Sequence, residues 1–205
     1  MQSADYERIK SKIGEVYEEN ADFLNRIPID IFGLARKMGF RLIKASDRLK
    51  IGIDKVKEFQ DINKEKDIYG YTFFDASNME YVIYYDDVNA GRKKQRFSVA
   101  HEIGHIVLGH IDEGIENSDE AETEANYFAG YILCPDCLSI NEEIFQNLSE
   151  RFYLISEWFG IADDTAMIKL ENHSNRNSLS TLRCYEYEQT IMECLEEAVL
   201  TKIRD

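Results

Sequence analysis

The stretch that decides the fold is RFSVAHEIGHIVLGH at residues 96–110, followed closely by EAETEANYFAGYILCP at residues 120–135. Apolar residues recur at helical spacing in both segments, so we expect one helix over about 94–108 and a second over about 119–133. A glycine follows the first helix and a proline the second, and both residue types commonly end helices. An acidic segment joins the two predicted helices.

The first of these helices carries the motif His101-Glu102-Ile103-Gly104-His105. Positions four residues apart lie on the same face of a helix, so the two imidazoles can bind one Zn²⁺ ion with Glu102 beside it. The alternative is a pair of solvated histidines on a helix surface. The rest of the helix is rich in apolar residues, where polar groups need partners or a metal ion to offset lost hydration. This context favours the metal site.

A catalytic zinc site needs a third protein ligand and one open position. The pattern that supplies a third histidine requires Gly at 108 and His at 111, where the chain has Leu108 and Ile111. That pattern therefore fails, and we expect His110 to lie just past the end of the helix. The remaining source of a third ligand is a carboxylate from the following helix.

The second helix opens with several carboxylates, among them Glu120, Glu122 and Glu124. Acidic residues in a first turn also complement the helix dipole, which is sufficient to explain Glu120. Spacing alone does not decide between Glu122 and Glu124 as the metal ligand. Glu122 and Asn126 are one helical turn apart, so we expect Asn126 to hydrogen-bond and orient a ligating histidine.

The segments before the motif predict two helices, a strand and a β-hairpin. The expected ranges are a helix at 5–25, a helix at 29–39 that begins at Pro28 and Asp30 and ends at Gly39, a strand at 41–44, an irregular segment at 45–67, and strands at 69–75 and 79–85 joined by the turn ASN. After the motif, helices are expected at 141–151, 152–160, 163–173 and 186–203.

The predicted fold is α+β and mostly helical, with a small antiparallel sheet of about three strands. We expect a single domain over residues 1–205. Within it, an N-terminal helical segment occupies 1–27, the core occupies 28–173, and a helical extension occupies 174–205.

The composition limits the partners of this chain. It has 205 residues, 44% of them hydrophobic, and a formal net charge of −15. Such an acidic protein is repelled by phosphate backbones and by anionic lipid surfaces, which argues against direct binding to nucleic acid or membranes. The first residues lack the apolar core of a secretory signal, so we expect a cytoplasmic protein. Its four cysteines are then expected to be thiols: Cys134, Cys137, Cys184 and Cys194.

The two quoted segments together resemble the ImmA/IrrE family of metallo-endopeptidases, most strongly over residues 70–135. The resemblance implies a minimal zincin-like core that binds one zinc ion. It implies that His101, His105 and Glu122 are the metal ligands and that Glu102 is the general base. Two imidazoles and one carboxylate suit zinc, although they also accept manganese or iron.

The same resemblance implies a cytoplasmic endopeptidase that cleaves a specific regulator. The expected substrate is a repressor of the phage or mobile-element type, with a helix-turn-helix domain, or a related regulator of a stress response. In zincins an edge strand aligns an extended substrate, and we expect residues 79–85 to be that strand. The alternative is a non-proteolytic metal-binding regulator, or one half of a toxin–antitoxin pair. The oligomeric state is left open by the sequence.

Overall fold

The structure of the protein is a computed structural model that describes residues 3–20, 22, 27–50, 69–135, 148–176, 188–190 and 192–193. The elements in chain order are α1 (Ser3–Glu19), α2 (Ile31–Lys37), β1 (Arg41–Lys44), η2 (Ala45–Lys50), β2 (Gly70–Asp75), β3 (Glu80–Tyr85), α4 (Arg92–Val107), α5 (His110–Glu113), α6 (Asp119–Leu133), α7 (Leu148–Phe159) and α8 (Asp163–Arg176). The predicted α+β fold, mostly helical with a small sheet, is confirmed.

The sheet has three strands in the order β1-β3-β2. Strands β2 and β3 form the predicted hairpin and pair antiparallel, from Gly70 opposite Tyr85 to Asp75 opposite Glu80. The prediction of a wholly antiparallel sheet is wrong, because β1 pairs parallel to β3. The long connection between β1 and β3 allows this arrangement, since parallel strands need a crossover rather than a tight turn.

The expectation that residues 79–85 form an edge strand is also wrong. Strand β3 occupies the middle of the sheet, paired on both sides, and β2 lies at an edge of the described sheet. The hairpin turn is stabilised by Asp75, whose carboxylate accepts a hydrogen bond of 3.0 Å from the backbone of Ser77. Such side-chain-to-backbone bonds are typical of turns that contain aspartate.

Helix α2 is two residues shorter at each end than the predicted range 29–39, but the residues expected to begin and end it do so. The carboxylate of Asp30 accepts a hydrogen bond of 3.0 Å from the backbone of Gly33, which caps the first turn. Gly39 adopts a φ of +84°, a left-handed conformation that favours glycine. The backbone N–H of Phe40 then donates to the carbonyl of Ala35 over 3.0 Å, which completes a Schellman motif. The chain is thereby directed from α2 straight into β1.

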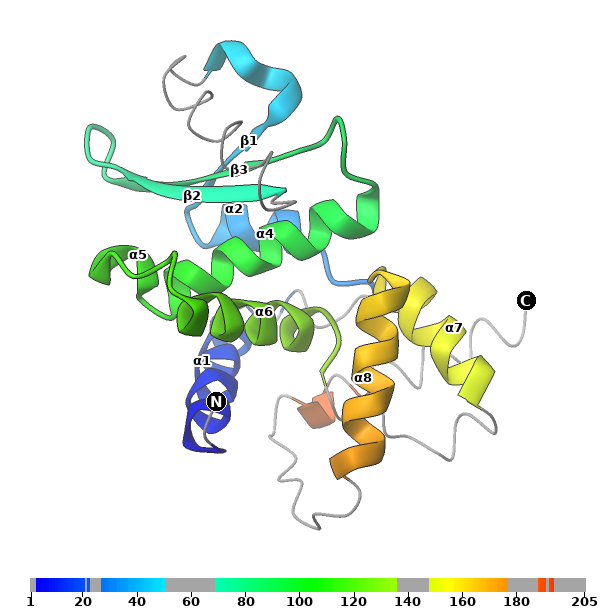
Figure 1. The fold of residues 1–205 in the computed structure, drawn as a ribbon. Helices are drawn as coiled ribbons and strands as arrows, with labels where there is room; N and C mark the ends of the chain where they lie inside the picture. The colour runs from blue at the N-terminus through cyan, green and yellow to red at the C-terminus, as the bar shows by residue number, and fades with distance from the viewer. Residues whose placement is uncertain are drawn as a thin grey trace.

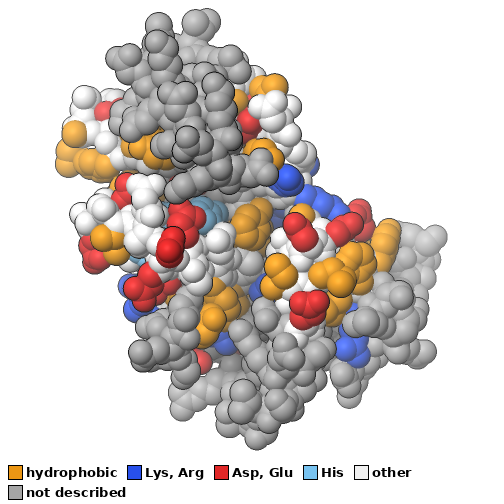
Figure 2. Space-filling view, viewed as in Figure 1, with side chains coloured by type: hydrophobic (Ala, Val, Ile, Leu, Met, Phe, Trp, Pro, Cys, Tyr) orange, Lys and Arg blue, Asp and Glu red, His pale blue; other side chains and the backbone are white. Residues whose placement is uncertain are grey.

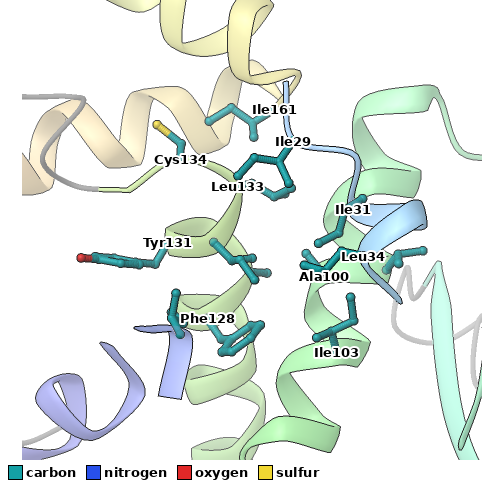
Figure 3. Packing of buried hydrophobic residues seen from close by; sticks show 14 of the residues in the cluster. Ile29, Ile31, Leu34, Ala100, Ile103, Phe128, Tyr131, Leu133, Cys134 and Ile161 are labelled. Atoms are coloured by element: carbon teal, nitrogen blue, oxygen red, sulfur yellow. The ribbon is translucent and has the colours of Figure 1, made fainter. Parts of the chain in front are cut away.

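Helix α4 lies at the centre of the molecule, with the sheet on one side and α6 on the other (Figure 1). Figure 3 shows buried apolar side chains of α2, α4 and α6 meeting in one core. Gly104 lies where α4 and α6 approach, and a Cβ atom there would be 3.2 Å from the Cβ of Phe128. The absence of a side chain at Gly104 therefore permits the close packing of the two helices.

Several predicted boundaries differ from those of the structure. Residues 45–50 form the 3-10 helix η2 rather than an irregular segment, whereas residues 51–68 lie outside the described residues. Helix α7 continues through the break that was expected between residues 151 and 152. Sequence patterns locate the interior of a helix better than its ends, because frayed termini carry little periodicity.

Other predictions fall partly outside the described residues. Helix α1 ends at Glu19, and most of the predicted continuation to residue 25 is not described. The predicted helix at 186–203 is described only at 188–190 and 192–193, where it is helical. Cys134 is buried in the core, and the other three cysteines lie outside the described residues. In the ranges described, no helix is both long and apolar enough to cross a lipid bilayer.

Arg96 connects α4 to two distant parts of the chain. Its side chain donates hydrogen bonds to the carbonyls of Ile29 (2.7 Å), Phe159 (3.1 Å) and Gly160 (3.1 Å). Burial lowers the pKa of Arg96 to about 10, and the residue is only 6% exposed. The guanidinium thus replaces its hydration with backbone acceptors, as a buried charge requires.

We expect Arg96→Met to lower the free energy of unfolding by about 3 kcal/mol or more, because three buried carbonyls lose a charged donor. Urea denaturation followed by circular dichroism measures this change. Lys94→Met, at an exposed position two residues earlier, is the matched control and should cost less than about 1 kcal/mol. Equal losses in the two variants would contradict the role of Arg96.

Candidate metal centre

Three potential metal ligands meet between α4 and α6. The Nε2 atoms of His101 and His105 are 2.9 Å apart. Glu122 places one carboxylate oxygen 3.3 Å from Nε2 of His101 and the other 3.9 Å from Nε2 of His105. Ligand atoms bound to one tetrahedral zinc ion lie roughly 3.3 Å from one another. The spacing of these three residues therefore fits a single ion.

The electrostatics of the two histidines differ. Burial, reinforced by the charge of His101, lowers the pKa of His105 to about 3, so its ring is neutral at pH 7. Burial would also lower the pKa of His101, but the hydrogen bond to Glu122 and the negative charges of Glu102 and Glu122 outweigh it and raise that pKa. A neutral imidazole is the form that binds a metal. A cation between these groups would take the place of the proton that Glu122 favours on His101.

The second ring nitrogen of each histidine, Nδ1, contacts a neighbouring side chain that orients the ring. Nδ1 of His101 lies 3.0 Å from Oδ1 of Asn126. This places Asn126 where the sequence predicts it, one turn after Glu122 on the same helix. Since the amide oxygen can only accept, Nδ1 carries the proton and Nε2 keeps its lone pair for a metal.

The corresponding partner of His105 is His110, which the sequence places just past the helix end. Gly109 has a φ of +84°, so the chain turns sharply and His110 begins the short helix α5. The ring of His110 is buried, with its Nδ1 3.1 Å from Nδ1 of His105. His110 thus contacts a potential ligand without joining the ligand group. The third histidine within ten residues was the only signal of this contact in the sequence.

Glu124 lies apart from the ligand group. Its Oε2 atom is 3.1 Å from Nε2 of His110 and also accepts a hydrogen bond from Arg8 of α1. Burial would raise the pKa of Glu124, but the hydrogen bonds from Arg8 and His110 outweigh it and lower the pKa. Of the two acids that spacing left open, the geometry brings Glu122 to the histidines. No local pattern in the sequence pointed to Arg8.

Glu102 lies in the same cleft as the potential ligands. The cleft is lined by residues of β2, α4, α6 and the segment around α5: Gly70, Tyr71, Thr72, His101, Glu102, His105, Ile111, Glu116, Asn117 and Glu122. Burial raises the pKa of Glu102 above its ordinary value. Figure 2 shows histidine side chains at the middle of one face, beside acidic ones. A buried carboxylate beside potential metal ligands is placed to exchange a proton with a molecule bound in the cleft.

Strand β2 packs tightly against Glu102. A Cβ atom at Gly70 would lie 3.0 Å from Oε1 and 3.1 Å from Cγ of Glu102. These distances are shorter than ordinary van der Waals contacts, so Gly70 defines the space in which the carboxylate sits. We therefore expect any side chain at position 70 to displace Glu102.

We expect Gly70→Ala to lower the turnover of a cleaved substrate by about tenfold, because small displacements of a reacting group are costly. Zinc affinity should change little, since the three atoms nearest to a Cβ at position 70 belong to Glu102 and Ser98 rather than to a potential ligand. Gly91→Ala is the matched control, because a Cβ atom there meets no atom within 4 Å. Equal turnover in both variants would contradict the positioning role of Gly70.

Comparison with protein-family models identifies a family for this chain. A family model described as the IrrE N-terminal-like domain, Peptidase_M78, matches residues 58–161. This range covers about half of the chain and includes both helices of the metal centre, whereas α1 lies outside it. No curated protein matches the chain.

Proposed function

This chain belongs to the Peptidase_M78 family of IrrE N-terminal-like domains, and on that premise we propose that it is a zinc-dependent endopeptidase. The observation that carries the proposal is the convergence of His101, His105 and Glu122 within one cleft that also holds the buried carboxylate of Glu102. Two imidazoles and one carboxylate leave a fourth tetrahedral position open, as a catalytic site requires.

When bound, zinc supplies Lewis acidity and lowers the pKa of a coordinated water molecule from 15.7 to about 7. The protein residues position the reacting groups and transfer the proton. Glu102 accepts the proton of the attacking water and returns it to the nitrogen of the leaving amine. Its burial in the cleft beside the proposed ligands supports this role, because a general base must lie within reach of the proton that it accepts.

Strand β2 is the element that we propose to align the substrate. It lies at an edge of the described sheet, and Gly70, Tyr71 and Thr72 line the cleft beside Glu102. The backbone of an edge strand can pair with an extended peptide and present its carbonyl groups at regular intervals. Such pairing favours a substrate segment that is unfolded or can be pulled out locally.

The proposed substrate is a specific regulatory protein, such as a repressor with a helix-turn-helix domain. A net charge of −15 disfavours direct contact with DNA, so an effect on transcription would pass through a protein partner. The second candidate function is a metal-binding regulator that does not cleave. Burial of Glu102 in the cleft favours the peptidase, because a structural zinc site fills its fourth position and needs no base.

The test is incubation of the zinc-loaded protein with candidate helix-turn-helix regulators, including any encoded beside its gene, followed by mass spectrometry of the products. We expect one or a few discrete cuts, because the enzyme is proposed to be specific. Removal of zinc with a chelator should reduce cleavage to background, and added zinc should restore it. Stoichiometric zinc without any cut would favour the non-proteolytic regulator.

A further inference from the structure

We propose that Arg8, Glu124 and His110 form a positioning chain that orients His105 for the metal and thereby connects helix α1 to the metal centre. The inference rests on the proposed function, because it concerns the same metal site. It goes beyond that function by assigning a role to three residues that are neither metal ligands nor the general base.

The direction of the hydrogen bonds along the chain follows from the ligand role of His105. Its Nε2 faces the ligand group, 2.9 Å from Nε2 of His101, so the ring proton sits on Nδ1. This Nδ1 is 3.1 Å from Nδ1 of His110, which must therefore act as the acceptor. His110 then carries its proton on Nε2 and donates it to Glu124 over 3.1 Å. Each ring has one tautomer that satisfies both of its contacts.

The chain ends on a carboxylate that needs a charged partner. The Glu124 side chain is 7% exposed, and Arg8 donates to the same oxygen, Oε2, that accepts from His110. A buried carboxylate without such a partner loses much of its stability as an anion. Arg8 therefore holds Oε2 of Glu124 in place as the acceptor for Nε2 of His110. This contact leaves Nδ1 of His110 to accept from His105.

Helix α1 holds Arg8 in place. The buried side chains of Ile9 and Ile13 belong to the main core, and the hydroxyl of Tyr17 donates to the carbonyl of Ile132 over 2.6 Å. The Arg8 side chain is 47% exposed, so solvent reaches one side of the chain of contacts. Helix α1 lies outside residues 58–161, the range that matches the family model. The contact that Arg8 makes with Glu124 therefore adds a part of the chain that the family model does not include.

Two variants and their controls test the proposal. Glu124→Gln keeps the shape of the side chain but removes its charge, and Arg8→Met removes the charged partner. We expect zinc dissociation constants about 10–100-fold higher in Glu124→Gln and roughly 3–10-fold higher in Arg8→Met, because partners of ligating histidines contribute this much to metal affinity. Arg8→Lys retains the positive charge and should recover most of the affinity.

The controls are Glu120→Gln, at an exposed position on α6, and Lys12→Met on α1, where the side chain is 43% exposed, and each should bind zinc like the wild type. Zinc affinity is measured by competition with a chromophoric chelator, and the visible spectrum of the Co²⁺-loaded protein reports the ligand geometry. We expect that spectrum to change in Glu124→Gln and to stay unchanged in the controls. Circular dichroism confirms that each variant is folded.

Wild-type affinity and an unaltered Co²⁺ spectrum in both Glu124→Gln and Arg8→Met would overturn this inference alone. Weakened zinc binding in Glu124→Gln with wild-type binding in Arg8→Met would overturn the connection to α1. A wild-type protein that takes up no zinc would overturn the proposed function as well. The readouts do not depend on finding the substrate.

Discussion

Glu102→Gln is expected to reduce peptide cleavage by about 10²–10⁴-fold, the usual contribution of a positioned general base. Glutamine has nearly the same shape as glutamate, so it fits the space beside Gly70 without displacing the strand. Its amide cannot accept the proton of the attacking water. The proposed metal ligands are unchanged in this variant, so zinc content should stay near that of the wild type.

The measurement combines single-turnover cleavage with metal analysis of the same preparation. Glu113→Gln, at an exposed position in α5, makes the same chemical change outside the cleft and serves as the control. A Glu102→Gln protein that holds zinc and still cleaves at the wild-type rate would show that Glu102 is not the base. Loss of zinc from this variant would instead show that the carboxylate helps to hold the metal.

Glu122→Ala is expected to weaken zinc binding by about 10²-fold or more. Structural zinc sites with four ligands bind with roughly 10–16 kcal/mol, so one ligand of a site contributes about 3 kcal/mol. Removal of this carboxylate also relieves the hydrogen bond that raises the pKa of His101. The remaining pair of imidazoles should bind zinc weakly and exchange it rapidly.

Chelator competition measures this loss, with Glu120→Ala from the same helix as the control. Glu120 is exposed in the first turn of α6 and belongs to no ligand group among the described residues. Wild-type affinity in Glu122→Ala would exclude Glu122 as a ligand. Equal losses of zinc affinity in Glu120→Ala and Glu122→Ala would indicate a general charge effect at the helix terminus rather than coordination by Glu122.

The parts of the structure that could be predicted are those that leave a local signal. Helices α4 and α6 differ from their predicted ranges by two residues at most, because helical spacing and the residues that end each helix are visible in the sequence. The motif at 101–105 identified two potential ligands for the same reason. Asn126 followed from its position one turn after Glu122.

Features that depend on contacts between residues far apart in the sequence could not be predicted from local patterns. The parallel alignment of β1 with β3 depends on how a long connection crosses the molecule, and the alternation of residues within a strand is the same in either direction. The contact between Arg8 and Glu124 joins residues 116 positions apart. Spacing alone also left Glu122 and Glu124 as equal candidates, and the family resemblance rather than the local pattern favoured Glu122, which the structure places beside the two histidines.

The metal centre is built from one continuous segment of chain, although the cleft around it is not. Its potential ligands lie between residues 101 and 122, on helices joined by residues 108–118. Closing so short a connection costs little chain entropy, so the two helices can pack together without waiting for contacts with distant parts of the chain. We therefore expect a nascent chain to capture its metal ion before Arg96 secures the turn that follows α7. The ability to hold zinc would then arise earlier during synthesis than the fully stabilised domain.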